Sequence, residues 1–178
     1  MNLTSVKSFF SLHETVVLTG FTKYMLDYLT REQIFAPTNY DVGRRGVRRQ
    51  YSYSDVVLLR ALFEVCAKRG KVRHLKGALQ EFRQDFGSMK PGQRIDKQLF
   101  IQGDELCVYT SSKGGMQLRS GQFTFSFVID LSVVSRHVAD CVEVASDGNC
   151  FKLTEEVANH AETERQRIWQ SIKRKRAV

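Results

Sequence analysis

The spacing of apolar residues changes at one point in this chain, and that change restricts the folds open to it. Residues 87–94 contain Pro91 and Gly92 and are typical of a linker. Before this segment, apolar residues recur three and four apart, as in amphipathic helices, whereas after it they alternate with polar residues, as in strands. Helices followed by strands predict an α+β fold. The expected parts are a helical domain over 1–88, a β-rich domain for dimerisation or partner binding over 95–150, and a C-terminal helix with a basic tip over 151–178.

The first two expected helices form a helix-turn-helix pattern. Ser11 and Glu14 have the spacing of a capping box and open a short helix, and Thr22 can cap a second one. Gly20 between them permits a tight backbone turn. The two helices are expected over 12–17 and 22–31. In DNA-binding proteins with this pattern, the second helix lies in the major groove.

An arginine-rich segment follows the second helix. Residues 38–51 combine four arginines with asparagine, aspartate and glycine, and this composition predicts a small hairpin or wing. Ser52 and Asp55 form a second capping-box pattern, so a helix is expected over about 54–69. A fourth helix is expected over about 72–86, where apolar residues are again spaced three and four apart. Together these elements predict a winged helix-turn-helix domain.

Strands are expected after the linker. Phe123, Phe125, Phe127 and Ile129 occupy every second position, which predicts a half-buried strand. Glycine-containing turns separate this segment from shorter ones. The expected elements are strands over 99–101, 105–109, 116–118 and 122–131, a short helix over 132–141, and a last helix from about Thr154 to the basic run 173–176.

The positive charge of the chain is concentrated in its first half. The 27 basic and 19 acidic residues give a net charge of +8. Residues 1–90 carry +7, residues 91–150 carry −2 and residues 151–178 carry +3. Such an excess favours a polyanionic partner, although a charge that only aids solubility is the alternative. Because the excess coincides with the helix-turn-helix pattern, double-stranded DNA is the expected partner.

The residues expected to contact DNA lie on the second helix and in the arginine-rich segment. Side chains at the start of such a helix reach base edges, and basic residues beside it contact phosphates. The alternatives are a solvated turn for the arginines and ordinary amphipathic packing for the tyrosines. The predicted DNA-binding residues are Thr22, Lys23, Tyr24, Asp27, Tyr28, Arg31, Arg44, Arg45, Arg48, Arg49 and Tyr51.

Two runs in this region resemble a known family. Similarity to the MerR-type winged helix-turn-helix domain is carried by residues 20–37, GFTKYMLDYLTREQIFAP, and residues 46–56, GVRRQYSYSDV. The resemblance covers about residues 10–86 and implies that fold and DNA binding. The chain departs from the family at Asp27, where arginine is usual, at Thr30, where an acidic residue is frequent, and at Gln33, where glycine is usual. Asp27 is expected either to accept a hydrogen bond from a cytosine amino group or to pair with Arg31.

The second half of the chain indicates which MerR-like proteins it is similar to. The metal and drug sensors of the MerR family continue with a long dimerisation helix, whereas strands are expected here from about residue 99. A MerR-like domain followed by a small β-rich region is similar to certain VapBC-type antitoxins. That resemblance implies a PIN-domain ribonuclease toxin as partner, and repression of the shared operon by the antitoxin dimer.

Cysteine spacing leaves a metal-responsive regulator as a further alternative. An eight-residue gap separates Cys141 from Cys150, as in the metal loop of MerR sensors, and thiolates bind Zn, Cu(I) or Hg. Cys107 and His137 are candidates for a third ligand. The alternative is that these cysteines are buried or idle, and no metal or other cofactor is expected.

Composition and motifs argue against a membrane protein, a secreted protein and an enzyme. Hydrophobic content of 42% and charged content of 26% are typical of a globular protein. No apolar run approaches the ~20 residues of a membrane span, no signal peptide is expected, and scattered cysteines without a CxxC pair favour the cytoplasm. The four histidines are dispersed and no nucleophile or phosphate-loop motif occurs, so an enzyme is not expected. The predicted function is a sequence-specific transcriptional regulator, a repressor that dimerises to read two half-sites.

Overall fold

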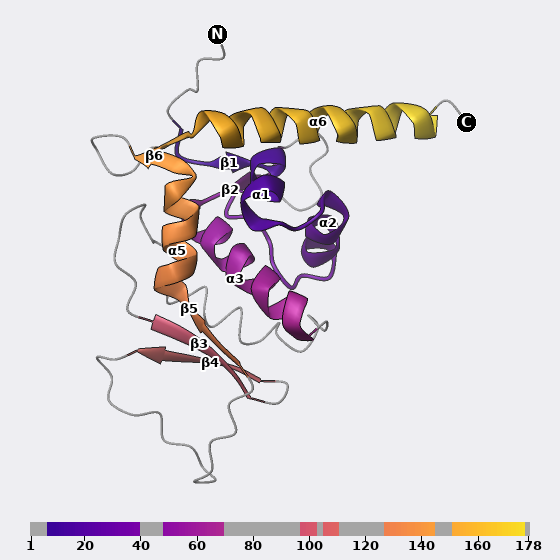
Figure 1. The fold of residues 1–178 in the computed structure, drawn as a ribbon. Helices are drawn as coiled ribbons and strands as arrows, with labels where there is room; N and C mark the ends of the chain where they lie inside the picture. The colour runs from indigo at the N-terminus through magenta and orange to yellow at the C-terminus, as the bar shows by residue number, and fades with distance from the viewer. Residues whose placement is uncertain are drawn as a thin grey trace.

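The computed structural model describes residues 7–39, 48–69, 97–102, 105–110, 127–144 and 151–176 (Figure 1). They form an α+β fold, as expected, and most of the described residues are helical. The helices are α1 (Leu12–Thr19), α2 (Lys23–Arg31), α3 (Tyr53–Arg69), α5 (Leu131–Asp140) and α6 (Glu155–Arg176). The strands are β1 (Phe10–Ser11), β2 (Gln50–Tyr51), β3 (Lys97–Gln102), β4 (Glu105–Thr110), β5 (Phe127–Asp130), β6 (Val142–Val144) and β7 (Phe151–Leu153). Within these ranges, every helix is too short or too polar to cross a membrane.

Side-chain caps determine where α1 and α2 begin. The Ser11 hydroxyl accepts a hydrogen bond of 3.5 Å from Glu14 N, and the Glu14 carboxylate accepts one of 2.7 Å from Ser11 N. At the start of α2, Thr22 Oγ1 accepts a hydrogen bond of 3.2 Å from Met25 N. These bonds satisfy backbone donors that have no partner inside a helix. Both predicted helices are confirmed, and α1 extends two residues beyond its predicted end to Thr19.

The turn between α1 and α2 requires glycine. Gly20 has φ +83°, in the left-handed region, and its N–H donates to Val16 O over 3.0 Å. A Cβ at this position would lie 3.0 Å from the Phe63 ring of α3. Phe63 in turn packs edge-on against Phe21, with ring centroids 5.3 Å apart. The tight turn therefore brings the corner between α1 and α2 against α3.

A second capping box begins α3 and also holds the arginine-rich segment. Asp55 N donates to Ser52 Oγ over 3.1 Å, and the Asp55 carboxylate accepts from Ser52 N over 3.0 Å. The same carboxylate oxygen accepts from Thr38 N and Thr38 Oγ1 at 2.8 and 2.7 Å. Asp55 itself is only 1% exposed, and its partners Thr38 and Ser52 lie closer to the surface. Asp55 thus joins the residues on both sides of the 40–47 segment.

A two-stranded antiparallel sheet closes the base of the arginine-rich segment. β1 pairs with β2, with Phe10 opposite Tyr51, and an isolated antiparallel bridge joins Asn39 to Gln50. The two ends of the predicted wing therefore lie side by side. Residues 40–47 of the predicted wing, with Arg44 and Arg45, lie outside the described residues.

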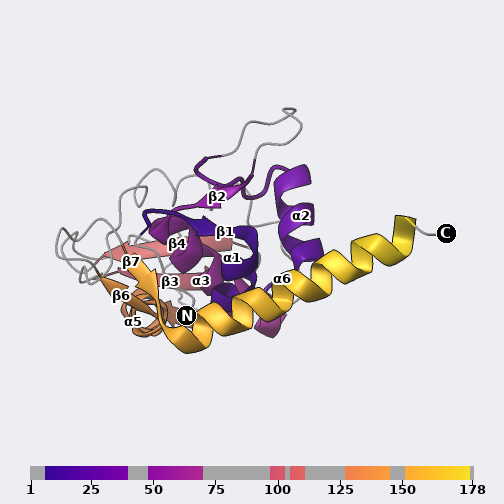
Figure 2. The same ribbon diagram turned by 90° about the horizontal axis from the view of Figure 1, so that it is seen from above.

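One hydrophobic core contains residues from both halves of the chain. α3 lies at its centre, where Val56 and Leu59 are fully buried, and it contacts both α1 and α5 (Figure 1). The Tyr53 hydroxyl of α3 donates to Ser135 O of α5 over 3.0 Å. α6 lies across α1, as Figure 2 shows from above. The two halves of the chain thus pack against each other through α5 and α6, whereas the predicted domain boundaries stay a prediction.

The second sheet has the order β4–β3–β5 and is antiparallel throughout. The strands predicted over 99–101 and 105–109 are confirmed as β3 and β4. The strand predicted to reach residue 131 ends instead at Asp130, whose carboxylate accepts from Ser132 N over 2.8 Å and caps α5. The helix cap therefore ends the alternating pattern at this point. The predicted helix over 72–86 and strand over 116–118 lie outside the described residues.

The antiparallel pair β6–β7 was not predicted from the sequence. Each strand has three residues, and Val142 lies opposite Leu153. Alternation cannot be recognised in so short a segment. α6 begins one residue after Thr154, as predicted, and Ala161 on its predicted apolar side is buried.

Candidate nucleic-acid interface

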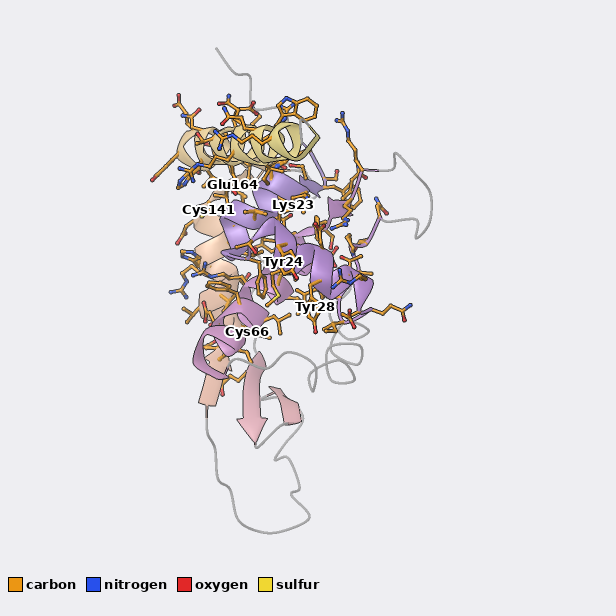
Figure 3. All side chains as sticks on the ribbon, turned by 90° about the vertical axis from the view of Figure 1, so that its right-hand side faces the viewer. Lys23, Tyr24, Tyr28, Cys66, Cys141 and Glu164 are labelled. Atoms are coloured by element: carbon orange, nitrogen blue, oxygen red, sulfur yellow. The ribbon has the colours of Figure 1, made fainter. Side chains whose placement is uncertain are left out.

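α2 is a surface helix with one buried and one exposed side. Leu26 and Leu29 are 2% and 0% exposed and hold the helix on the core. Tyr24, on the other side, is 76% exposed. Figure 3 looks onto this exposed side, with Lys23, Tyr24 and Tyr28 labelled along it. At 3.6 residues per turn, Tyr24, Asp27, Tyr28 and Arg31 lie away from the two buried leucines. Thr22, the N-cap residue, precedes Leu26 by one turn and is exposed because it stands at the end of the helix.

Arg31 stacks on Tyr28 near the end of α2. The guanidinium carbon lies 5.8 Å from the centroid of the ring, and Arg31 Nε donates to Glu32 Oε1 over 3.4 Å. A cation–π contact at an exposed site contributes about 0.5–1 kcal/mol. The Arg31 side chain remains 66% exposed, so its guanidinium is oriented by the ring and still accessible to an anion.

Asp27 joins α2 to the arginine-rich segment. Its Oδ1 accepts a hydrogen bond of 2.6 Å from Arg49 Nη1, and its Oδ2 accepts one of 3.0 Å from Lys23 Nζ. The predicted pairing with Arg31 is therefore wrong. The physical reason is tertiary: the chain returns beside α2 at Arg49, while the Arg31 guanidinium is turned toward Tyr28 and Glu32.

The environment of Arg49 keeps its positive charge in place. Partial burial lowers the pKa of the guanidinium, but the hydrogen bond and negative charge of Asp27 outweigh burial, and the pKa is raised above its ordinary value. The Arg49 side chain is 21% exposed. Arg48, the preceding residue, is exposed to solvent. Of these two predicted phosphate contacts, Arg48 is thus the more accessible and Arg49 is partly committed to Asp27.

Tyr51 is not part of the accessible surface. Its side chain is 1% exposed, and it lies opposite Phe10 in the sheet of β1 and β2. Burial raises the pKa of the phenol to about 12, against the opposing effect of Arg49. The prediction that Tyr51 contacts DNA is therefore corrected: the side chain is a core residue beneath Arg49, because β2 turns it inward.

The backbone reverses sharply at the end of α2. Gln33 has φ +54°, in the left-handed region that favours glycine. Its N–H donates to Thr30 O over 3.1 Å, and Ile34 N donates to Leu29 O over 2.9 Å. Ile34 and Phe35 are each 4% exposed. The reversal thus satisfies the last carbonyls of α2 and directs two apolar residues into the core.

The cysteines give only a partial test of metal binding. Cys141 donates from Sγ to His137 O over 3.4 Å, and burial raises the pKa of its thiol. Burial also raises the pKa of the Cys66 thiol, to about 11. Within the described part of the chain, no three His, Cys, Asp or Glu side chains form a group that could hold a metal ion. Cys150 and the side chain of Cys107 lie outside that part.

No protein-family model matches this chain, and no curated protein matches it. Function is therefore inferred from the chemistry of the α2 surface. There the structure brings together Lys23, Asp27 and Arg49, which lie beside the exposed Tyr24 and the stacked pair of Tyr28 and Arg31.

Two interactions at this surface were missed from the sequence. The Lys23–Asp27 pair has the four-residue spacing of a helical ion pair, so the spacing alone could have indicated it. The Asp27–Arg49 pair joins residues 22 positions apart, and no local pattern indicates it. Its effect is to make part of the predicted positive surface internally neutral.

Proposed function

We propose that this chain is a sequence-specific DNA-binding transcriptional regulator with a MerR-like winged helix-turn-helix domain. The observation that carries the proposal is the exposed side of α2, which presents Tyr24 and Arg31 and which the Asp27–Arg49 ion pair ties to the arginine-rich segment. In domains of this type the second helix enters the major groove and the wing contacts the flanking backbone. A fixed distance between these two elements is what such binding requires.

The proposed roles follow from position along α2. The nine residues of this helix span about 14 Å, comparable with the ≈ 12 Å width of the major groove. Thr22 and Tyr24 lie at its N-terminal end, which is the end that reaches base edges. Arg31 at the other end and Arg48 in the predicted wing are suited to phosphates. Asp27 is then a positioning residue, because both of its oxygens already accept hydrogen bonds from cations.

Gln33 supports the resemblance to the MerR-type domain. The family usually has glycine at this position, and glycine adopts the left-handed region without steric cost. A left-handed φ of +54° at the same position, with glutamine in place of glycine, favours the MerR-type path of the chain after α2. The substitution leaves the turn in place at an energetic cost.

The proposed protein acts as a dimer in the cytoplasm and represses transcription by occupying its site. A helix-turn-helix protein reads two half-sites about one helical turn apart, which requires two copies of the reading helix. The antitoxin and metal-responsive alternatives stay predictions from the sequence alone.

A selection of bound sequences from random duplex DNA tests the proposal. We expect an enriched motif with two half-sites about 10 base pairs apart. Tyr24→Ala should weaken binding to the selected motif. Arg48→Ala should weaken binding to all sequences and make the dependence of log K on log salt shallower by about 1. Arg136→Ala is the matched control, because it removes an exposed arginine from α5. Recovery of no motif, with the Arg48 variant binding as tightly as the parent protein, would overturn the proposal.

A further inference from the structure

The charges of α6 are separated along its length. Residues 155–164 contain four acidic residues and no lysine or arginine, whereas residues 165–176 contain six basic residues and no acidic one. We call residues 165–176 the basic half of α6. With a rise of about 1.5 Å per residue, it extends for about 18 Å. Cations in the last turn of a helix interact favourably with its dipole. The basic residues of α6 begin well before the last turn, so the dipole does not account for all six.

The two halves of α6 also differ in their surroundings. Ala161 in the first half is 6% exposed, and Val157 and Ala158 pack against the core formed by α1 and its neighbours. The basic half continues past α1 toward the C-terminus (Figure 1), and the view from above shows the same course (Figure 2). The packing of α6 on α1 therefore fixes the direction in which the basic half extends.

That direction is toward the side of the molecule that carries α2. Figure 1 places α2 and the C-terminal end of α6 on its right-hand side, and Figure 2 agrees. Figure 3, seen from that side, shows α6 running obliquely above the helix that carries Lys23, Tyr24 and Tyr28. An anion large enough to span both elements would meet the exposed side of α2 and the basic half of α6 together.

Three cations of the basic half are described, and all three are accessible to solvent. The side chains of Arg165 and Arg167 are 63% and 73% exposed, and Arg174 is also exposed. Arg165 pairs with Glu162 at 3.2 Å, and Arg167 with Glu164 at 3.6 Å. Exposed pairs of this kind are weak and screened by salt, so a phosphate can replace the carboxylate. Arg167 and Arg174 are seven residues apart and lie on one face of the helix, about 10 Å from each other along its axis.

We propose that the basic half of α6 is a second DNA-contacting element, which binds the phosphate backbone of the same duplex whose major groove receives α2. The inference rests on the proposed function and extends it to a partner contact in the second half of the chain. The regular charge of duplex DNA, one phosphate per ≈ 1.7 Å of axis, is the complement of an extended row of cations. Such contacts strengthen binding without reading sequence.

The test compares two double variants that each remove two positive charges. Arg167→Gln/Arg174→Gln neutralises one face of the basic half. Arg136→Gln/Lys152→Gln is the matched control, because both residues are exposed and lie on α5 and β7, on the side of Figure 1 away from α2. The probe is a fluorescent mixed-sequence duplex of about 30 base pairs, roughly three helical turns, titrated at several salt concentrations.

Loss of two phosphate contacts lowers the slope of log K against log salt by about 1.8 and weakens binding about tenfold or more at 0.1 M salt. The control should bind like the parent protein, and Arg167→Lys/Arg174→Lys should keep the parent slope because it keeps the charge. Equal thermal unfolding curves for the variants exclude a folding defect. A parent-like slope for the α6 variant, while Arg48→Ala still weakens binding, overturns this inference and leaves the proposed function standing. If the parent protein does not bind the duplex, both this inference and the proposed function are overturned. If the α6 variant changes the molecular mass of the protein in solution but not the slope of log K against log salt, the basic half is an interface between copies of the chain instead.

Discussion

The Asp27 carboxylate of α2 accepts a hydrogen bond of 2.6 Å from the guanidinium of Arg49, which belongs to the arginine-rich segment. This ion pair joins two elements that are separated by 22 residues in the chain. It also places a negative charge in the middle of the surface proposed to meet DNA. Asp27 therefore fixes the relative position of the two elements and at the same time weakens the attraction of that surface for phosphate.

Replacing Asp27 with asparagine should tighten binding to mixed-sequence duplex DNA. The variant removes the negative charge that compensates one of the two cations, Lys23 and Arg49, so the slope of log K against log salt should become steeper by about 1. Asp140→Asn on α5 makes the same change in net charge at an exposed position and should have little effect. Binding to mixed-sequence duplex no tighter than that of the parent protein would contradict this prediction.

Replacing Gln33 with glycine should stabilise the protein. A residue with a side chain is strained at φ +54°, and this strain outweighs the entropy lost by introducing glycine, so we expect a gain of about 0.5–1 kcal/mol in the free energy of unfolding. Urea denaturation measures it. Glu32→Gly is the control, because Glu32 has φ −78° and gains nothing from glycine. Equal destabilisation by both substitutions would contradict the strain argument.

Replacing Asp55 with alanine should destabilise the protein strongly. One carboxylate oxygen accepts from Thr38 N, Thr38 Oγ1 and Ser52 N, and the residue is 1% exposed. Loss of the helix cap together with the charge-assisted hydrogen bonds from Thr38 and Ser52 should lower the free energy of unfolding by about 2–4 kcal/mol. Asp140→Ala, at an exposed position, should stay within about 0.5 kcal/mol of the parent. A small effect at Asp55 would mean that water replaces the carboxylate.

Replacing Tyr51 with phenylalanine should remove part of the loss of stability at alkaline pH. The pKa of Tyr51 is raised from 10.0 to about 12, chiefly by burial. Because the folded state holds this proton more tightly, its contribution is complete below pH 10 and is lost as the pH rises toward 12. A shift of this size corresponds to about 2–3 kcal/mol. Denaturation at neutral and alkaline pH, with Tyr24→Phe as an exposed control, checks it, and identical pH profiles for all three proteins would refute it.

Local signals accounted for most of the first half of the fold. Ser11, Thr22 and Ser52 begin helices because their hydroxyls cap backbone donors, and Gly20 turns the chain because it tolerates a positive φ. Each of these signals acts within four residues, so it can be recognised in the sequence. The same locality explains the error at Asp130, where an alternating pattern continued past a capping residue.

The arrangement of the candidate site required the tertiary structure. The sequence by itself determined that α2 is an amphipathic helix beside an arginine-rich segment and that positive charge is concentrated there. Only the folded chain decided that Arg49 is neutralised by Asp27, that Tyr51 is buried, and that the basic half of α6 extends on the side of α2. The reason is that caps and periodicity depend on neighbours along the chain, whereas ion pairing and burial depend on which distant segments the core brings into contact.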